Sequence, residues 1–250
     1  MRVLGKEIPG YVSLAVWFLF WEAIGQAKLS SLVPPFSAVL EAAIELLPTD
    51  KFRSAALISL RSFALGMGLA LAIGIPLGVL MARVKSVGRI LGLWVNIFVS
   101  APISALVPIL MAVIGIGETT VVVTVFLFAV FVIILDTQVG VMHADRSLVE
   151  MARAFGATRR QLYSKVLLLS ALPEILAGVR LGAIRGVKGV VIGQLLVAII
   201  GVGELFELYS QHFLMEEFWA LVVIVFLFAF AVSEAIAALE RRVEYYAASR

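Results

Sequence analysis

Residues Ser62–Ala82 decide the fold class, and they read SFALGMGLALAIGIPLGVLMA with no Asp, Glu, Lys or Arg. A helix needs about 20 mostly apolar residues to cross roughly 30 Å of hydrocarbon, so this stretch predicts a membrane-crossing helix. The composition agrees, because 62% of the 250 residues are hydrophobic and only 15% are charged. Soluble domains carry about 25% charged residues, so the composition argues against a soluble fold.

Five further apolar runs extend this interpretation along the chain. They are Ile8–Trp21, Ile90–Gly117, Thr119–Leu135, Gly189–Gly203 and Phe218–Ser233. We therefore expect an all-α polytopic membrane protein with six transmembrane helices. Residues 1–250 form a single transmembrane domain in this interpretation, with an N-terminal helix and outer loop over 1–54, a core over 55–240 and a cytoplasmic tail over 241–250.

The Lys and Arg residues are distributed unevenly between the two sides of this bundle. Thirteen of the twenty lie in the segments 1–10, 83–89, 143–165 and 241–250. The opposite connections hold only Lys28, Lys51 and Arg53. Because Lys and Arg in short loops stay on the cytoplasmic side, we expect both termini in the cytoplasm. Cations confined to short loops between spans do not suggest nucleic-acid binding.

The outer connection between the first two spans contains a helical pattern of its own. Pro34 and Pro35 precede Phe36–Leu47, in which Leu40, Ala43 and Leu47 recur at helical spacing. This pattern predicts a short amphipathic helix on the outer surface. We favour a role in shaping the entrance to the bundle over a role as a docking site.

Two spans carry small residues at four-residue spacing. The second has Gly66, Ala70, Gly74 and Gly78, and the fifth has Gly178, Gly182 and Gly186. Such spacing puts the glycines on one face, where neighbouring backbones can approach closely. We expect both helices to be central. Pro76, Pro102 and Pro108 each remove a helical hydrogen bond and predict local bends.

A longer cytoplasmic segment joins the fourth and fifth spans. Asp145 or Ser147 can cap a short helix there, and Gly156 can end it. Leu148, Ala152 and Phe155 then line one side of the helix. By itself this pattern is equally typical of an amphipathic connector.

The same segment resembles the cytoplasmic signature of ABC importer permeases, which reads Glu-Ala-Ala, three residues, Gly, nine residues, Ile, one residue, Leu-Pro. Glu150, Ala152 and Gly156 match in place, whereas Met151 and Leu169 depart from the signature. Further similarity to the nitrate, sulfonate and taurine branch lies in Gly74–Gly78, Ala101–Pro102, Ala105–Pro108, Gly115–Glu118 and Ala177–Gly182.

The resemblance implies a permease subunit in the bacterial inner membrane. It implies a homodimer in lipid, two ATPase subunits on the cytoplasmic side and an extracytoplasmic substrate-binding protein. The coupling helix that meets the ATPase then comprises Glu150, Met151, Ala152, Arg153, Phe155 and Gly156. The sequence has no Gly-x-x-x-x-Gly-Lys-Ser/Thr phosphate loop, so we expect no bound cofactor, with ATP and Mg used by the partner ATPase.

Polar residues within the spans are the candidates for a translocation pathway. Arg185 and Lys188 lie three residues apart in the fifth span, and Gln194, Ser100 and Ser104 complete the set. Charges at membrane depth face protein or water, so one interpretation is a cation-lined route for a small anion such as a sulfonate, taurine or nitrate. The other is pairing with Glu118, Asp136 or Glu174.

Two other function classes remain as alternatives. An enzyme is disfavoured, because the two histidines are assigned to opposite sides and Asp136 has no intramembrane aspartate partner. A proton-coupled secondary transporter is the closer alternative, since Glu22 and Asp136 can relay protons. No metal site is expected.

Overall fold

The computed structural model describes residues 2–3, 6–7, 10–28, 30–143, 146–197 and 199–248. Its regular secondary structure is helical apart from a two-stranded antiparallel hairpin of β1 (Arg2–Val3) and β2 (Lys6–Glu7). This confirms the predicted all-α class. The elements in chain order are α1 (Gly10–Gln26), α2 (Phe36–Leu46), α3 (Asp50–Arg83), α4 (Lys85–Ser100), the 3-10 helix η1 (Ile103–Leu106), α5 (Val107–Ile114), α6 (Glu118–Met142), α7 (Arg146–Ala154), α8 (Arg159–Gln161), the π-helix η2 (Leu162–Leu167), α9 (Leu168–Ser170), α10 (Leu172–Val197), α11 (Gly201–Gln211) and α12 (Met215–Ala248).

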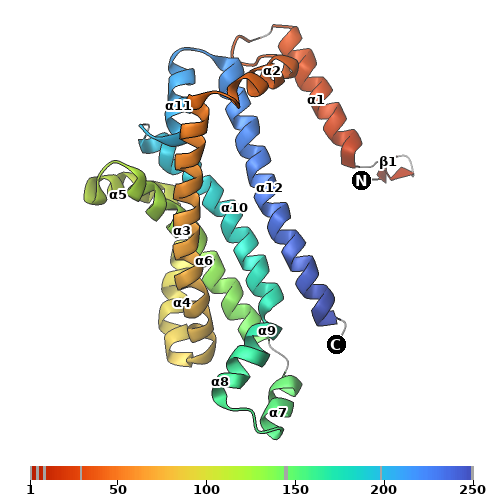
Figure 1. The fold of residues 1–250 in the computed structure, drawn as a ribbon, viewed down its shortest axis with the longest axis vertical. Coiled ribbons are helices and arrows are strands. Elements are labelled where there is room, and N and C mark those ends of the chain that lie inside the picture. Colours follow the sequence, from red (N-terminus) through yellow and green to blue (C-terminus); the bar gives the residue numbers. More distant parts are fainter. Residues whose placement is uncertain are drawn as a thin grey trace.

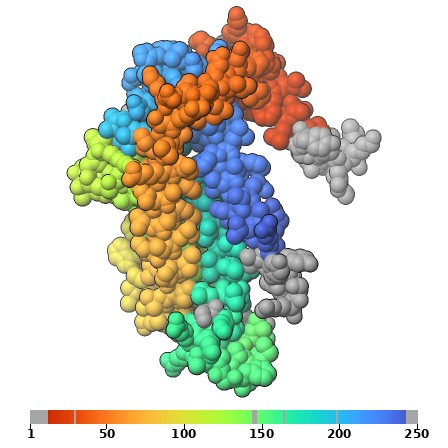
Figure 2. Space-filling view, in the orientation of Figure 1, coloured from red at the N-terminus to blue at the C-terminus, as the bar shows by residue number. Residues whose placement is uncertain are grey.

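The long helices run along one axis of the molecule. In Figure 1, α3, α6, α10 and α12 follow this axis, α2 and α11 lie at one end, and α7 and α8 lie at the other. Figure 2 shows the same separation on the molecular surface, where α2 and α11 cover the end opposite α7 and α8. The segments predicted to face outward and the segment predicted to face the cytoplasm therefore lie at opposite ends.

Three described helices are long and apolar enough to cross a membrane without interruption: α3, α6 and residues Met215–Arg242 of α12. Two bent pairs can each supply one more span, α4 with Ile103–Ile114 and Arg159–Ser170 with α10. Residues Val12–Gln26 form a shorter apolar helix. The count of six spans therefore stays a prediction, with α1 as the candidate for the first.

The apolar run Ile90–Gly117 is not one straight helix. α4 ends at Ser100, Ala101 is extended, and the chain becomes helical again at Ile103. The two halves meet at 93°. Ala101 precedes Pro102, and a residue before proline is held out of the α conformation, which accounts for the break. The bend predicted at Pro102 is present and much larger than a local kink, whereas α3 continues through Pro76.

The glycine-bearing helices α3 and α10 enclose α6. A Cβ on Gly66 would come within 2.6 Å of the Val125 side chain, and one on Gly78 within 2.7 Å of Thr137. From the other side, a Cβ on Gly178 would lie 2.6 Å from the Cβ of Asp136. Gly74 and Gly182 both pack against Ile133, and Gly186 packs against Phe63 of α3 and Val125 of α6. The central helix is therefore α6, between the two helices that the spacing of small residues indicated.

The outer amphipathic helix exists as α2, but its buried face differs from the prediction. The buried residues are Val39, Ala42, Ala43 and Leu46, and α2 packs against α12. Leu40 and Leu47, expected on the apolar face, are exposed. Of the three residues on which the prediction rested, Ala43 is therefore on the buried face and Leu40 and Leu47 are not. Ala220 of α12 packs directly on the buried cluster, and this long-range contact selects the face.

Candidate functional site

The segment that resembles the permease signature folds as a short helix with a defined end. α7 covers Arg146–Ala154 and lies at the tip of the molecule (Figure 1). Gly156 has φ +76°, its N–H donates to Arg153 O at 2.9 Å, and the N–H of Ala157 donates to Ala152 O at 3.0 Å. This bonding pattern is a Schellman motif, in which a glycine with positive φ satisfies the last helical carbonyls. The predicted helix stop at Gly156 is therefore present, and Asp145, a predicted cap, lies outside the described residues.

One side of α7 is apolar and exposed. Leu148, Met151 and Phe155 follow each other at spacings of three and four residues, and Phe155 is 86% exposed. Ala152, which we placed on this side, is half-buried, and Glu150, Arg153 and Gly156 are exposed. Met151, a departure from the signature, therefore enlarges the apolar surface. Burying a phenylalanine side chain contributes about 1.5–3 kcal/mol, so this surface can bind a partner.

The chain returns from α7 to the bundle through a series of short helices. Thr158 starts α8 with a capping box, in which Thr158 Oγ1 accepts from Gln161 N at 3.3 Å and Gln161 Oε1 accepts from Thr158 N at 2.9 Å. The π-helix η2 follows, and Arg159–Ser170 meets α10 at 60°. π-Helical turns recur at functional sites. The segment after Gly156 is thus held in a defined conformation.

A contact that the sequence did not indicate links this series to α3. The Arg83 guanidinium lies over the Tyr163 ring, 4.8 Å from its centroid. Arg83 is the last residue of α3, and Tyr163 belongs to η2. Such a cation–π contact contributes about 0.5–2 kcal/mol. The only feature of the sequence that could have indicated this contact is the Arg at the end of an apolar run. Many membrane-crossing helices end in this way, so the feature does not identify the partner.

The charged residues of the spans have different surroundings. Arg61 Nε lies 3.4 Å from Glu118 Oε1, which pairs α3 with the start of α6. Among the described residues, neither Arg185 nor Lys188 of α10 forms an ion pair with Glu118, Asp136 or Glu174. Lys188, one turn beyond Arg185 along α10, is exposed on the single chain. Pairing and a cation-lined route therefore both stay predictions for these two residues.

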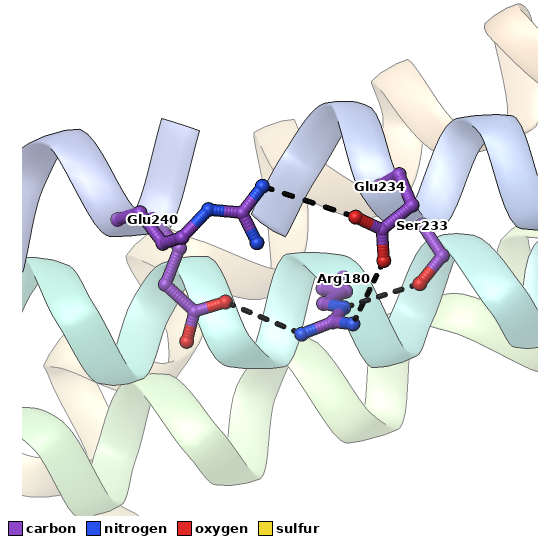
Figure 3. A network of polar contacts seen from close by, with 5 residues as sticks. Arg180, Ser233, Glu234 and Glu240 are labelled. Carbon is purple, nitrogen blue, oxygen red and sulfur yellow. Dashed lines mark hydrogen bonds and ion pairs between the residues drawn. The ribbon is translucent and has the colours of Figure 1, made fainter. Parts of the chain in front are cut away.

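Arg180 is the centre of a polar network between α10 and α12 (Figure 3). Its Nε donates to Ser233 Oγ at 3.1 Å, and its two terminal nitrogens lie 3.9 Å from Glu234 and 3.7 Å from Glu240. Arg241 also pairs with Glu234, at 3.8 Å. Several partly exposed charges in one network hold geometry better than an isolated pair. Nothing in the sequence indicated the α12 carboxylates as partners of Arg180, since they lie more than 50 residues from it.

The remaining pathway candidates lie in two places. Ser100 and Ser104 flank the 93° bend between α4 and η1, and η1 contacts α10. Gln194 is fully buried, with its Oε1 2.7 Å from Ser59 Oγ, and Ser59 Oγ also accepts from Val202 N at 3.0 Å. In this structure Gln194 joins α3, α10 and α11. The structure thus places η1, which contains Ser104, in contact with α10 and leaves Gln194 inside the protein. The pathway itself stays a prediction.

Comparison with known proteins identifies relatives over most of the chain. The taurine transport system permease protein TauC of Escherichia coli K12 is 28% identical over 237 residues, which are 92% of this chain and 86% of TauC. A probable ABC transporter permease protein of Brucella melitensis biotype 1 is 30% identical over 201 residues, 80% of each chain. The carnitine transport permease protein OpuCD of Listeria monocytogenes is 37% identical over 121 residues, 47% of this chain and 52% of OpuCD.

Solved structures share the fold. The inward-facing MetNI methionine ABC transporter aligns with a TM-score of 0.65 at 23% identity, over 75% of this chain and 93% of that one. An amino acid ABC transporter crystallised with histidines aligns at a TM-score of 0.63 and 15% identity. Residues 74–245 match the family model described as the binding-protein-dependent transport system inner membrane component. The chain therefore belongs to the family of inner membrane components of binding-protein-dependent transport systems.

Proposed function

We propose that this chain is the permease subunit of an ATP-driven importer that moves a small sulfonate of the taurine type inward across the cytoplasmic membrane. The observation that carries the proposal is α7, a helix with an exposed apolar side and a glycine stop, at the end of the bundle where the positive charges predict the cytoplasm. The similarity to TauC over 92% of the chain supports the sulfonate class. The exposed Lys188 on α10 supports an anionic solute.

In this proposal, the energy comes from two separate ATPase subunits. A groove of the ATPase receives Leu148, Met151 and Phe155, and closing of the ATPase dimer moves α7. The capping box, η2 and the Arg83–Tyr163 contact carry that movement to α10 and α3, so that the permease alternates between two states. A homodimer of permeases completes the route, and an extracytoplasmic binding protein delivers the solute.

Reconstitution tests the proposal. The permease is placed in vesicles with its partner ATPase and binding protein, with ATP inside the compartment that the ATPase faces. We expect uptake of labelled taurine that needs ATP and the binding protein and that persists with a protonophore. Uptake that ignores ATP and collapses with the protonophore would instead establish proton-coupled transport. Methionine and carnitine, tested in the same vesicles, check the solute class.

A further inference from the structure

A cavity of about 210 Å³ lies between α3, α10, α11 and α12. Almost all of the side chains that line it are apolar, among them Ala56, Val191 and Ile224. Phe206 of α11, Phe63 of α3 and Phe228 of α12 also line it, and the rings of Phe63 and Phe228 meet edge to face at 5.9 Å. The cavity is thus an almost entirely apolar space bounded by four helices.

The cavity exists because α3 and α12 pack on the same two helices and hardly on each other. Both contact α10 and α11, while the backbones of α3 and α12 stay apart and the two helices meet mainly through side chains such as Phe63 and Phe228. The two helices therefore form the sides of a wedge-shaped gap, and α10 lies behind this gap. The side chain of Leu60 on α3 lines the cavity and is 49% exposed, so the wedge is open between the two helices.

Only two polar residues, Ser59 and Gln194, lie at the wall. Ser59 Oγ lies 2.7 Å from Gln194 Oε1, 3.0 Å from Ala55 O and 3.0 Å from Val202 N, so both of these oxygens have partners within the protein. The amide nitrogen of Gln194 is buried beside Gly201 and has no hydrogen-bond partner in the described chain. The wall therefore offers one unpaired donor and no charge, and a charged solute would lose most of its hydration there without replacement, at a cost of several kcal/mol.

The opening lies between two candidate membrane spans, so we expect it to face the hydrocarbon of the membrane. α3 and α12 are two of the three uninterrupted candidate spans, and the α3 surface next to the opening continues as exposed apolar residues, including Leu57 at 66% exposure. An apolar cavity of about 150 Å³ in a protein stays dry and takes up benzene, so a larger one open to lipid can take up hydrocarbon. We propose that an acyl chain of a bilayer lipid occupies this cavity and fills the wedge between α3 and α12.

Photolabelling tests the occupant. The full chain is placed in vesicles of phosphatidylethanolamine that contain a small fraction of the same lipid with a diazirine in the middle of one acyl chain. After irradiation, mass spectrometry maps the labelled residues. We expect label on Val191 of the cavity wall as well as on exposed Leu57. Ala56→Phe fills the cavity and should reduce label on Val191 several-fold while leaving label on Leu57 unchanged.

Ala64→Phe is the matched control, because Ala64 is exposed on the same helix and does not line the cavity. If Ala56→Phe does not assemble, Val191→Phe replaces it, with label read at Ala56. Equal label on Val191 in the two Ala→Phe variants would overturn the proposal. So would label on Leu57 without label on Val191, as expected if a second copy covers the opening. Loss of Val191 label on adding taurine would assign the cavity to the solute instead.

Discussion

Gly156 has a left-handed backbone with open space around it. No atom lies within 4 Å of the position that a Cβ would take, so an alanine there meets only the backbone penalty of φ +76°, about 1–2 kcal/mol. We expect Gly156→Ala to loosen the end of α7 and to reduce ATP-dependent uptake while the protein still inserts. Gly156→Asn should retain most uptake, because asparagine tolerates this conformation.

The control for this prediction is Gly68→Ala. Gly68 is also surrounded by open space, but it lies within α3 and has no positive φ. Uptake by this variant should equal that of the unmodified protein. If Gly156→Ala transported as well as Gly68→Ala, the conformation at Gly156 would have no part in coupling.

Lys188 is a cation at membrane depth that is exposed on the single chain. If it contacts the sulfonate group of the solute on its route, Lys188→Met should lower taurine uptake by about tenfold, which corresponds to roughly 1.4 kcal/mol of lost stabilisation. ATP hydrolysis without solute should not change. Lys85→Met, at the loop end of α4, is the matched control and should transport normally. Normal taurine uptake by Lys188→Met would exclude Lys188 from the route.

At the scale of elements, α7 presents an apolar face that has no cover within the described chain. Phe155→Ser removes its most exposed member. Because burial of a phenylalanine contributes about 1.5–3 kcal/mol, we expect the ATPase subunit to bind at least about tenfold more weakly in a titration of detergent-solubilised permease.

Phe213→Ser tests whether the effect depends on location. Phe213 is 75% exposed and lies just after α11, at the opposite end of the molecule. Its loss should leave ATPase binding unchanged. The same loss of affinity in both variants would show that general surface hydrophobicity, and not α7, drives the association.

At the scale of the whole molecule, the enclosure of α6 by two glycine faces determines stability. A Cβ on Gly178 would lie 2.6 Å from Asp136 Cβ, so Gly178→Ala must push α10 away from α6. Overpacking of this kind costs about 1–3 kcal/mol. We expect a lower Tm for Gly178→Ala in detergent, measured by intrinsic fluorescence, and an equal or higher Tm for Gly68→Ala, because alanine is more favourable than glycine within a helix. An unchanged Tm in both would mean that the α6–α10 contact is looser than the structure shows.

The sequence by itself determined the features that depend on local composition and spacing. Long apolar runs such as Ser62–Ala82 predict spans because length and hydrophobicity are read directly from the residues. The positions of Lys and Arg predict the sides, and the glycine after α7 predicts where that helix ends. These properties need no knowledge of which distant segments meet.

The tertiary structure decided everything that depends on a choice among distant partners. Packing against Ala220 of α12 selects the buried face of α2. The folded chain places α6 between α3 and α10. It also brings Arg180 close to Glu234 and Glu240. Proline at 102 predicts a bend, but its size of 93° depends on where α4 and α5 pack. Such contacts join residues far apart in the chain, and a single sequence does not record which of many apolar or charged positions pair.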